Sequence, residues 1–294
     1  MSGATHPATT GELAMQVMRL QAALFAEHVA QTQDGGDQEQ VHDARVATRR
    51  MRAALRLFSD VLSGDVEELQ AELGWMGSQL GAVRDLDVQL TRVRSTAEAL
   101  ELLEPLSPYC EWLEARRKQA QTAFEAALHS ERYVHLTEAL RALTEVAVQT
   151  EGQPSVEQDA PQRLKRAHRK LRKRADGLSV SSPAQAFHRA RIGAKRLRYA
   201  AEFFEPIYGK PARRLIEAAT AVQDLLGDHQ DSIVHTQRIH DAVAERAADW
   251  SPAANLALGQ LLQWEANHAE DLRAEFKATY RDVTSAWKHL QKAL

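Results

Sequence analysis

Apolar residues recur at helical spacing along almost the whole chain, and three polar stretches interrupt them. These stretches read QTQDGGDQEQ at residues 31–40, QTEGQPSVEQDAP at 149–161 and DGLSVSSP at 176–183, compositions typical of loops and linkers. No convincing run of alternating, β-branched residues indicates a strand. The most abundant residues, among them Ala, Leu, Arg, Glu and Gln, are good helix formers. The sequence therefore predicts an all-α protein, with a disordered N-terminus at residues 1–10 and a first helix at about 11–30.

One segment of the chain occurs twice. Residues 41–58, VHDARVATRRMRAALRLF, match residues 187–204, FHRARIGAKRLRYAAEFF, at an offset of 146 positions. The same offset aligns Leu80-Gly81 with Leu226-Gly227 and Asp85 with Asp231. Because a single offset holds for two separated motifs, we infer a tandem duplication with halves at 11–150 and 151–294.

The first copy of the motif predicts a helix with two distinct faces. On a helical wheel, one His and four Arg fall within an arc of about 80°, and they are His42, Arg45, Arg49, Arg52 and Arg56. The apolar residues fall on another side of the wheel, and they are Ala44, Ala47, Met51, Ala54, Leu55 and Phe58. Arg50 stands apart from both groups. The pattern predicts an apolar stripe for the core and a basic ridge on another face.

The second copy repeats both faces. Its ridge contains His188, Arg191, Lys195 and Arg198, with Arg196 at the position that matches Arg50, and its apolar side contains Ala190, Leu197, Ala201 and Phe204. Glu202 takes the place of the last Arg of the ridge, so we expect this copy to be partly neutralised at that end.

The chemistry of these rows points to a periodic anion. Like charges three and four residues apart repel one another on a helix, so such a row usually persists because something neutralises it. The planar guanidinium fork suits phosphate oxygens, and each His adds a donor that titrates near neutral pH. A single basic face is more often plain solvated surface, but recurrence of the row in register in both halves favours ligand binding.

A third basic helix is expected at residues 161–174, PQRLKRAHRKLRKR, where Arg163, Arg166, Lys170 and Lys173 share a face. Phosphate contact and a solvated face are equally compatible with it. Asp85 and Asp231 are expected to orient ridge arginines rather than to contact a ligand, and Gly81 and Gly227 to permit close approach of helices.

Charge is concentrated rather than high. The chain has 37 Lys or Arg and 40 Asp or Glu, a net charge of −3, yet thirteen of the basic residues lie between positions 163 and 198. The single cysteine, Cys110, excludes an intrachain disulfide and a cysteine-based zinc site. We expect a cytoplasmic protein, because neither a signal peptide nor a run of ~18 apolar residues is visible.

At these repeated motifs the sequence resembles the CHAD family, the conserved histidine α-helical domain. The family's hallmark, a duplicated helical motif with a His followed by spaced basic residues, matches from His42 to Arg52 and from His188 to Arg198. The resemblance implies two four-helix bundles related by a pseudo-twofold around a basic central pore or groove. It also implies binding of inorganic polyphosphate and, in bacteria, association with polyphosphate granules. Members of the family often occur beside a CYTH domain. The Glu-x-Glu-x-Lys signature of that domain is not present in this sequence, so we expect a stand-alone CHAD protein.

A binding module is favoured over an enzyme. Walker-type, Gly-x-Ser-x-Gly and His-Glu-x-x-His motifs are absent from the sequence. The spacing of His229, Asp231, His235 and His240 does not place a ligand set on one helix face, so no metal or other cofactor is expected. Two alternatives stay open. A nucleic-acid-binding protein is disfavoured because Tyr199 is the only aromatic residue interleaved with the ridges. A metal-dependent phosphohydrolase is disfavoured because the ridges carry cations rather than carboxylates.

Overall fold

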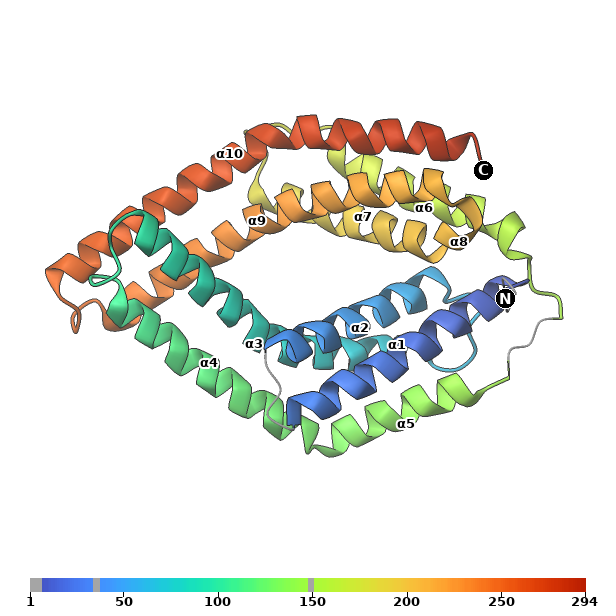
Figure 1. Cartoon of the computed structure of the whole chain (residues 1–294), viewed down its shortest axis with the longest axis horizontal. Coiled ribbons are helices and arrows are strands. Elements are labelled where there is room, and N and C mark those ends of the chain that lie inside the picture. The colour runs from blue at the N-terminus through green and yellow to red at the C-terminus, as the bar shows by residue number, and fades with distance from the viewer. Residues whose placement is uncertain (1–6, 34–37, 148–150) are drawn as a thin grey trace. The chain divides into compact units, whose positions relative to one another are not determined.

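The computed structural model describes residues 7–33, 38–147 and 151–294, and these form an all-helical protein, as predicted (Figure 1). The helices are α1 (Thr10–Gln33), α2 (Gln38–Leu57), α3 (Val66–Ala99), α4 (Ser107–Leu128), α5 (Glu131–Glu145), α6 (Val156–Ala175), α7 (Ala184–Phe203), α8 (Glu205–Tyr208), α9 (Lys210–Arg246) and α10 (Pro252–Gln291). In these ranges, the only β-type pairing is an isolated bridge between Thr9 and Ser155.

The chain divides into two compact units, whose boundaries fall inside helices. The first unit contains residues 1–85, 117–165 and 202–207, and the second contains 86–116, 166–201 and 208–294. The first unit therefore holds α1, α2, α5 and parts of α3, α4 and α6, whereas the second holds α9, α10, most of α7 and the remaining parts of the divided helices.

The core of the first unit forms around α1 and α2, which pack along each other. Phe58, which directly follows α2, is fully buried, and its ring lies 5.8 Å from the ring of Phe203 and 5.9 Å from that of Phe204. On the other side of α1, Arg19 donates from Nε to the carbonyl of Thr144 at 2.8 Å and from Nη2 to the carbonyl of Val146 at 3.1 Å. Arg19 thus satisfies carbonyl groups that the end of α5 leaves without helical partners.

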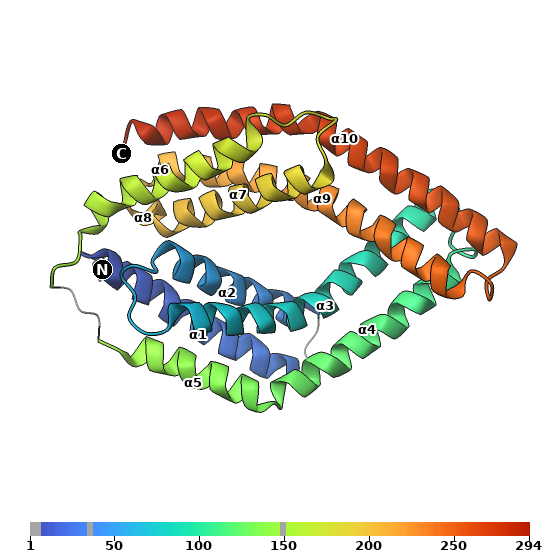
Figure 2. The same cartoon turned by 180° about the vertical axis from the view of Figure 1, so that it is seen from behind.

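The second unit is built on the long antiparallel pair α9 and α10, which pack together along their length (Figure 2). Ser251 caps α10 by accepting a hydrogen bond from the backbone N–H of Ala254 at 3.1 Å, and Pro252 follows at the first helical position, which needs no N–H donor. Phe187 of α7 packs edge-on against Phe276 of α10 at 5.6 Å. Gly193 brings α7 close to α6, because an added Cβ would lie 3.1 Å from the Leu171 side chain.

Two of the three expected breaks are shorter than predicted. The break at 31–40 is shortened because α1 continues to Gln33 and α2 begins at Gln38. The helix expected to begin at residue 161 begins at Val156, because Ser155 accepts the backbone N–H of Gln158 at 3.3 Å and caps it. Residues 34–37 and 149–150 of the expected loops, and 1–6 of the expected disordered N-terminus, lie outside the described residues. Thr9 and Thr10 are within them, and Thr10 is fully buried at the start of α1. The third loop, 176–183, separates α6 from α7 as expected.

Cys110 is a free thiol in α4 and is partly buried. Burial raises its pKa above the ordinary value for cysteine. Across the described ranges, every helix is too short or too polar to cross a bilayer.

Candidate anion-binding ridges

The basic residues of α2 lie on a face separate from its buried stripe. The six apolar residues expected in the core are at most 2% exposed, and they are Ala44, Ala47, Met51, Ala54, Leu55 and Phe58. The basic residues are exposed or partly exposed, and we call the set of His42, Arg45, Arg49, Arg52 and Arg56 the α2 ridge. The two faces predicted from the helical wheel are therefore present in the folded helix.

Two guanidinium groups of the α2 ridge lie against glycines of α3. A Cβ added at Gly81 would lie 3.5 Å from Nε of Arg45, and one added at Gly74 would lie 3.3 Å from Nη2 of Arg52. Arg45 also forms an ion pair with Asp85, with 3.2 Å between Nη2 and Oδ1. The absence of side chains at these glycines gives the arginines room to lie along α3. Asp85 orients Arg45, as the sequence suggested.

His42 begins the α2 ridge, and its surroundings favour the neutral imidazole. Partial removal from water has the largest effect on its pKa, followed by the guanidinium of Arg84, and together they lower the pKa below 6.5. Arg49 and Arg45 act in the same direction, whereas the carboxylate of Asp43 opposes them. A bound anion adds a negative charge here and would favour the imidazolium.

The second copy on α7 shows the same division into two faces. Its apolar side is fully buried, and it consists of Ala190, Leu197, Ala201 and Phe204. Its basic residues are partly exposed, and we call His188, Arg191, Lys195 and Arg198 the α7 ridge. His188, with its proton on Nδ1, donates to Oε1 of Gln230 on α9 at 2.9 Å, which fixes the orientation of the ring.

The contact between arginine and glycine recurs at equivalent positions. A Cβ added at Gly227 of α9 would lie 3.4 Å from Nη2 of Arg191, just as Gly81 of α3 meets Arg45. Both pairs are related by the offset of 146 residues. Each ridge is thus backed by a helix whose glycine accommodates the guanidinium group.

The arginines next to the ridges have different surroundings. Arg50 pairs with Glu202, with 2.8 Å between Nη1 and Oε2, and its guanidinium lies 6.0 Å from the ring centre of Phe203. Arg196, the matching residue of α7, is partly exposed. Arg198 lies 4.8 Å from the ring centre of its neighbour Tyr199, a distance that allows a cation–π contact.

The family of the chain follows from the segment that contains these two ridges. The sequence profile described as the CHAD domain matches residues 16–240, which include both ridges and the glycines that contact their arginines. This chain belongs to the CHAD domain family. Members of this family are generally associated with polyphosphate binding.

Relatives and solved structures agree with this membership. Two uncharacterized proteins of Mycobacterium tuberculosis, MT2285 and Rv2226, are each 33% identical to the chain over 261 residues, covering 84% of it. The alignment spans 48% of each relative, so the chain matches about half of their length. The crystal structure of the CHAD domain from the plant Ricinus communis superposes with a TM-score of 0.80 at 27% identity, covering 94% of this chain and 92% of that one. PptA from Streptomyces chartreusis shares the fold, with a TM-score of 0.72 at 19% identity, covering 96% of this chain and 100% of that one.

The third basic helix of this CHAD chain, α6, presents only part of the expected face. Arg166, Lys170 and Lys173 are exposed to solvent. Arg163 is only 3% exposed, and its guanidinium pairs with Asp60 at 2.8 and 2.9 Å and with Asp159 at 2.5 Å. Arg163 therefore stabilises the first unit and offers no donor to an external anion.

Two of the histidines considered as metal ligands, His229 and His235, have partners within the protein. His229 is buried and accepts a hydrogen bond at Nε2 from Nε of Arg273 at 3.0 Å, while burial and then Arg273 lower its pKa to about 4. His235 donates from Nδ1 to Oε1 of Glu265 at 2.7 Å. Within the described ranges, no three His, Cys, Asp or Glu side chains converge as a metal site.

A buried polar cluster in the second unit was missed from sequence. Arg92 of α3 donates hydrogen bonds to both carboxylate oxygens of Glu265 at 2.9 and 2.7 Å. It also donates to the hydroxyl of Ser232 at 2.7 Å. Glu265 is fully buried, which by itself would raise its pKa, but hydrogen bonds from His235 and Arg92 lower it to about 2. The available signal was the match of Arg92 to Arg238 at the repeat offset, since Arg238 donates to Gln89 in the same unit.

Proposed function

We propose that this chain binds inorganic polyphosphate through the α2 ridge and the α7 ridge. The observation that carries the proposal is the recurrence of one arrangement in two units, a His followed by cations on a face whose arginine lies over a glycine. Membership of a family associated with polyphosphate supports the ligand class. Arg50, Arg196 and the exposed α6 cations Arg166, Lys170 and Lys173 are proposed as additional contacts.

The dimensions of a ridge fit a chain of phosphates better than a single one. Its cations are three or four residues apart, which places neighbouring guanidinium groups ~5 Å apart along a row of ~15 Å. Each guanidinium can donate two parallel hydrogen bonds to phosphate oxygens. Because consecutive cations offer such donors in a line, a linear polyanion gains several contacts at once.

Burial of Tyr199, the aromatic residue interleaved with the ridges in the sequence, favours polyphosphate over single-stranded nucleic acid. Tyr199 is 3% exposed and lies beneath the guanidinium of Arg198. Stacking of bases on accessible aromatic rings is a common source of affinity for single strands, and Tyr199 does not offer its ring for it. Phosphate contacts alone remain, and inorganic polyphosphate presents the highest density of them.

In this proposal the chain is a cytoplasmic binding module, located on polyphosphate granules, rather than an enzyme, and it needs no cofactor. The ridges carry donors and cations, which hold phosphates, while metal-dependent hydrolysis would use carboxylate-bound divalent ions. The basic central pore that the family resemblance implies stays a prediction.

The test compares two triple variants with the wild type. Changing Arg45, Arg49 and Arg52 to Ala should weaken binding of long-chain polyphosphate on the order of a hundredfold, because three charge-assisted contacts are lost. Changing Arg191, Lys195 and Arg198 to Ala should have a comparable effect. The matched control changes three exposed arginines outside the ridges, Arg94, Arg141 and Arg281, and should bind like the wild type.

Circular dichroism must show that each variant is folded. If either ridge variant retains wild-type affinity, the model of two binding ridges is wrong. Single-stranded RNA and DNA are used as competitors, and equal competition by them would favour the nucleic-acid alternative. Incubation with polyphosphate and magnesium or manganese should release no orthophosphate, whereas multiple turnovers would show an enzyme.

A further inference from the structure

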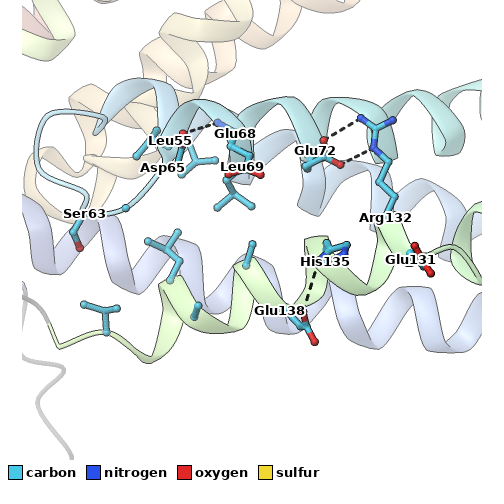
Figure 3. A pocket seen from close by; sticks show the side chains of 16 residues that line it. Leu55, Ser63, Asp65, Glu68, Leu69, Glu72, Glu131, Arg132, His135 and Glu138 are labelled. Carbon is cyan, nitrogen blue, oxygen red and sulfur yellow. Dashed lines mark hydrogen bonds and ion pairs between the residues drawn. The ribbon is translucent and has the colours of Figure 1, made fainter.

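A groove in the first unit lies away from the cationic residues described above. It runs between the N-terminal part of α3 and α5, with the end of α2 at its base, and encloses about 1210 Å³ (Figure 3). Its lining contains none of the residues of the α2 ridge. The groove is therefore distinct from the surface proposed to bind polyphosphate.

The groove has an apolar floor supplied from both sides. Leu55, Val66 and Leu69 contribute from α2 and α3, and four residues contribute from α5 and its end, Ala139, Ala142, Leu143 and Val146. The inward face of α5 is already occupied, because Leu136 and Leu140 are buried. The groove face of α5 is a second apolar stripe, where Ala139 and Ala142 are exposed and Val146 is 45% exposed. A short helix with two apolar stripes is suited to packing on two sides.

The rim of the groove is strongly acidic. Five carboxylates line it, from Asp65, Glu68, Glu72, Glu131 and Glu138, against one guanidinium, that of Arg132. Glu72 binds that guanidinium through both oxygens at 2.7 and 3.0 Å, and Figure 3 shows the pair at one end of the groove.

The ring of Trp75 also supports the guanidinium of Arg132, 4.5 Å away. Its single positive charge is thus committed to Glu72, and four rim carboxylates are left in excess. The imidazole of His135 lies 3.9 Å from the carboxylate of Glu138 and adds positive charge only when protonated.

We propose that this groove docks a basic amphipathic helix of a partner protein. Its apolar face would cover the floor, and its Lys or Arg side chains would lie against the rim carboxylates. Helices α3 and α5 offer no free backbone edge for an extended strand, so an amphipathic helix is the matching shape. The α5 side of the groove, residues 131–146, is ~22 Å long at ~1.5 Å per residue, enough for about four turns of a bound helix.

Charge decides the chemistry of the occupant. Four uncompensated carboxylates repel polyphosphate and acidic helices, and they attract a basic one during encounter and in the bound state. Apolar contacts with the floor would provide most of the affinity, as in other helix-in-groove complexes. The proposal goes beyond polyphosphate binding and does not depend on it.

The experiment uses synthetic helices as probes. A fluorescein-labelled peptide of about 18 residues, with leucines on one helical face and lysines on the other, is ~27 Å long. Two comparators replace its lysines by glutamates or scramble its sequence. Fluorescence anisotropy then measures binding of each peptide to the wild-type chain, without polyphosphate.

Two groove variants and one control identify the site. Glu68→Lys with Glu138→Lys removes the rim attraction, and Ala142→Trp fills the floor from an exposed position. Each should weaken binding of the leucine–lysine peptide by about tenfold or more. The control, Glu67→Lys with Glu125→Lys, makes the same charge change at exposed sites that do not line the groove, and it should leave binding unchanged.

Three results would overturn the proposal. Equal binding of the basic peptide to all variants would place it elsewhere on the chain. Equal or tighter binding of the acidic or scrambled peptide would reject a basic amphipathic helix as the occupant. A dimer in sedimentation experiments that Ala142→Trp abolishes, with no peptide binding, would assign the groove to a second copy of the chain. Ala142→Trp changes no charge and should keep wild-type affinity for polyphosphate, so failure here is distinct from failure of the ridge proposal.

Discussion

The contact of Arg45 with Gly81, repeated by Arg191 with Gly227, gives the ridges fixed positions for two of their longest side chains. A guanidinium group that is already oriented loses less conformational entropy when it binds a phosphate. The glycine is therefore part of the proposed site although it contacts no ligand.

The first prediction tests this role with paired substitutions. Gly81→Leu should displace the guanidinium of Arg45 and weaken polyphosphate binding roughly three- to tenfold, since an oriented contact is lost. Gly81→Ala is the control, because its Cβ would lie 3.5 Å from Nε of Arg45, an ordinary contact. It should bind normally and gain up to about 1 kcal/mol of stability from its higher helix propensity. Wild-type affinity in the leucine variant would show that the position of Arg45 is unimportant.

A second prediction at this scale concerns pH. The pKa of His42 is lowered in the free chain, which favours the neutral imidazole, and a polyanion should raise the pKa on binding. Protons are then taken up with the ligand, and affinity should rise as pH falls from about 8 to about 6. Titration calorimetry of the wild type and of the double variant His42→Gln, His188→Gln measures the difference.

His168 should not contribute to the pH dependence of binding between pH 8 and pH 6. Burial and the neighbouring Arg172 lower its pKa to about 4, so it stays neutral over the whole pH range of the experiment. If the double variant keeps the pH dependence of the wild type, His42 and His188 are not the groups that titrate.

Among the helices, the contact of α3 with α9 and α10 depends on a buried charge pair. Arg92→Met should lower the free energy of unfolding by about 3–5 kcal/mol, because it leaves the carboxylate of Glu265 buried without its cation. Adding Glu265→Leu should restore part of the loss, since replacing both partners removes the unpaired charge. Urea denaturation measures both variants.

The control lies on the surface of the same unit. Arg94 pairs with Glu114, and both side chains are about half exposed, at 55% and 50%. Arg94→Ala should cost less than about 1 kcal/mol, as is usual for exposed ion pairs. Equal losses in Arg92→Met and Arg94→Ala would mean that the buried cluster contributes no special stability.

The packing of α6 on α10 should make the chain sensitive to acid. The ring of His168 stacks on Trp287 at 4.1 Å, and its pKa of about 4 lies below the unfolded value of 6.5. The unfolded chain therefore binds the proton more readily, and stability is lost as pH falls from 6.5 towards 4. His168→Phe, which keeps the stacking, should remove that part of the pH dependence. An unchanged pH dependence in this variant would show that His168 does not titrate on unfolding.

The elements also show how far a sequence reading reaches. The two faces of α2 and of α7 could be predicted because helical periodicity alone separates their apolar and basic residues. The burial of Arg163 could not be predicted, because one of its partners, Asp60, is far away in sequence and only the fold brings them together. The same holds for Glu265. In the sequence it does not differ from the other acidic residues of α10, and only the fold brings Arg92 into contact with it. The acidic groove was not predicted, because alanines make up part of the second apolar stripe of α5 and the stripe is therefore not apparent in the sequence.

For the molecule as a whole, the distribution of charge matters more than its sum. The net charge is −3, yet cations gather on the ridges and α6, while carboxylates gather at the groove. In these two proposals, oppositely charged ligands bind the same near-neutral chain, each at its own surface.

Dependence on salt should reveal the number of phosphates that are bound. Affinity for polyphosphate should fall on the order of a hundredfold or more between 50 and 200 mM salt, by analogy with other polyanions that release counterions. The triple variant of Arg45, Arg49 and Arg52 should reduce the slope of log affinity against log salt by about three, one for each lost contact. An unchanged slope would mean that these arginines do not neutralise phosphates.

The lone thiol of Cys110 has a practical consequence for chemical labelling. Only the thiolate reacts with maleimides and iodoacetamides, and the partly buried Cys110 has a raised pKa, so little thiolate is present near neutral pH. A cysteine introduced at an exposed position such as Lys170, among cations that lower a thiol pKa, should react much faster. A fluorophore can thus be attached at a chosen point of the basic surface without removing the native cysteine.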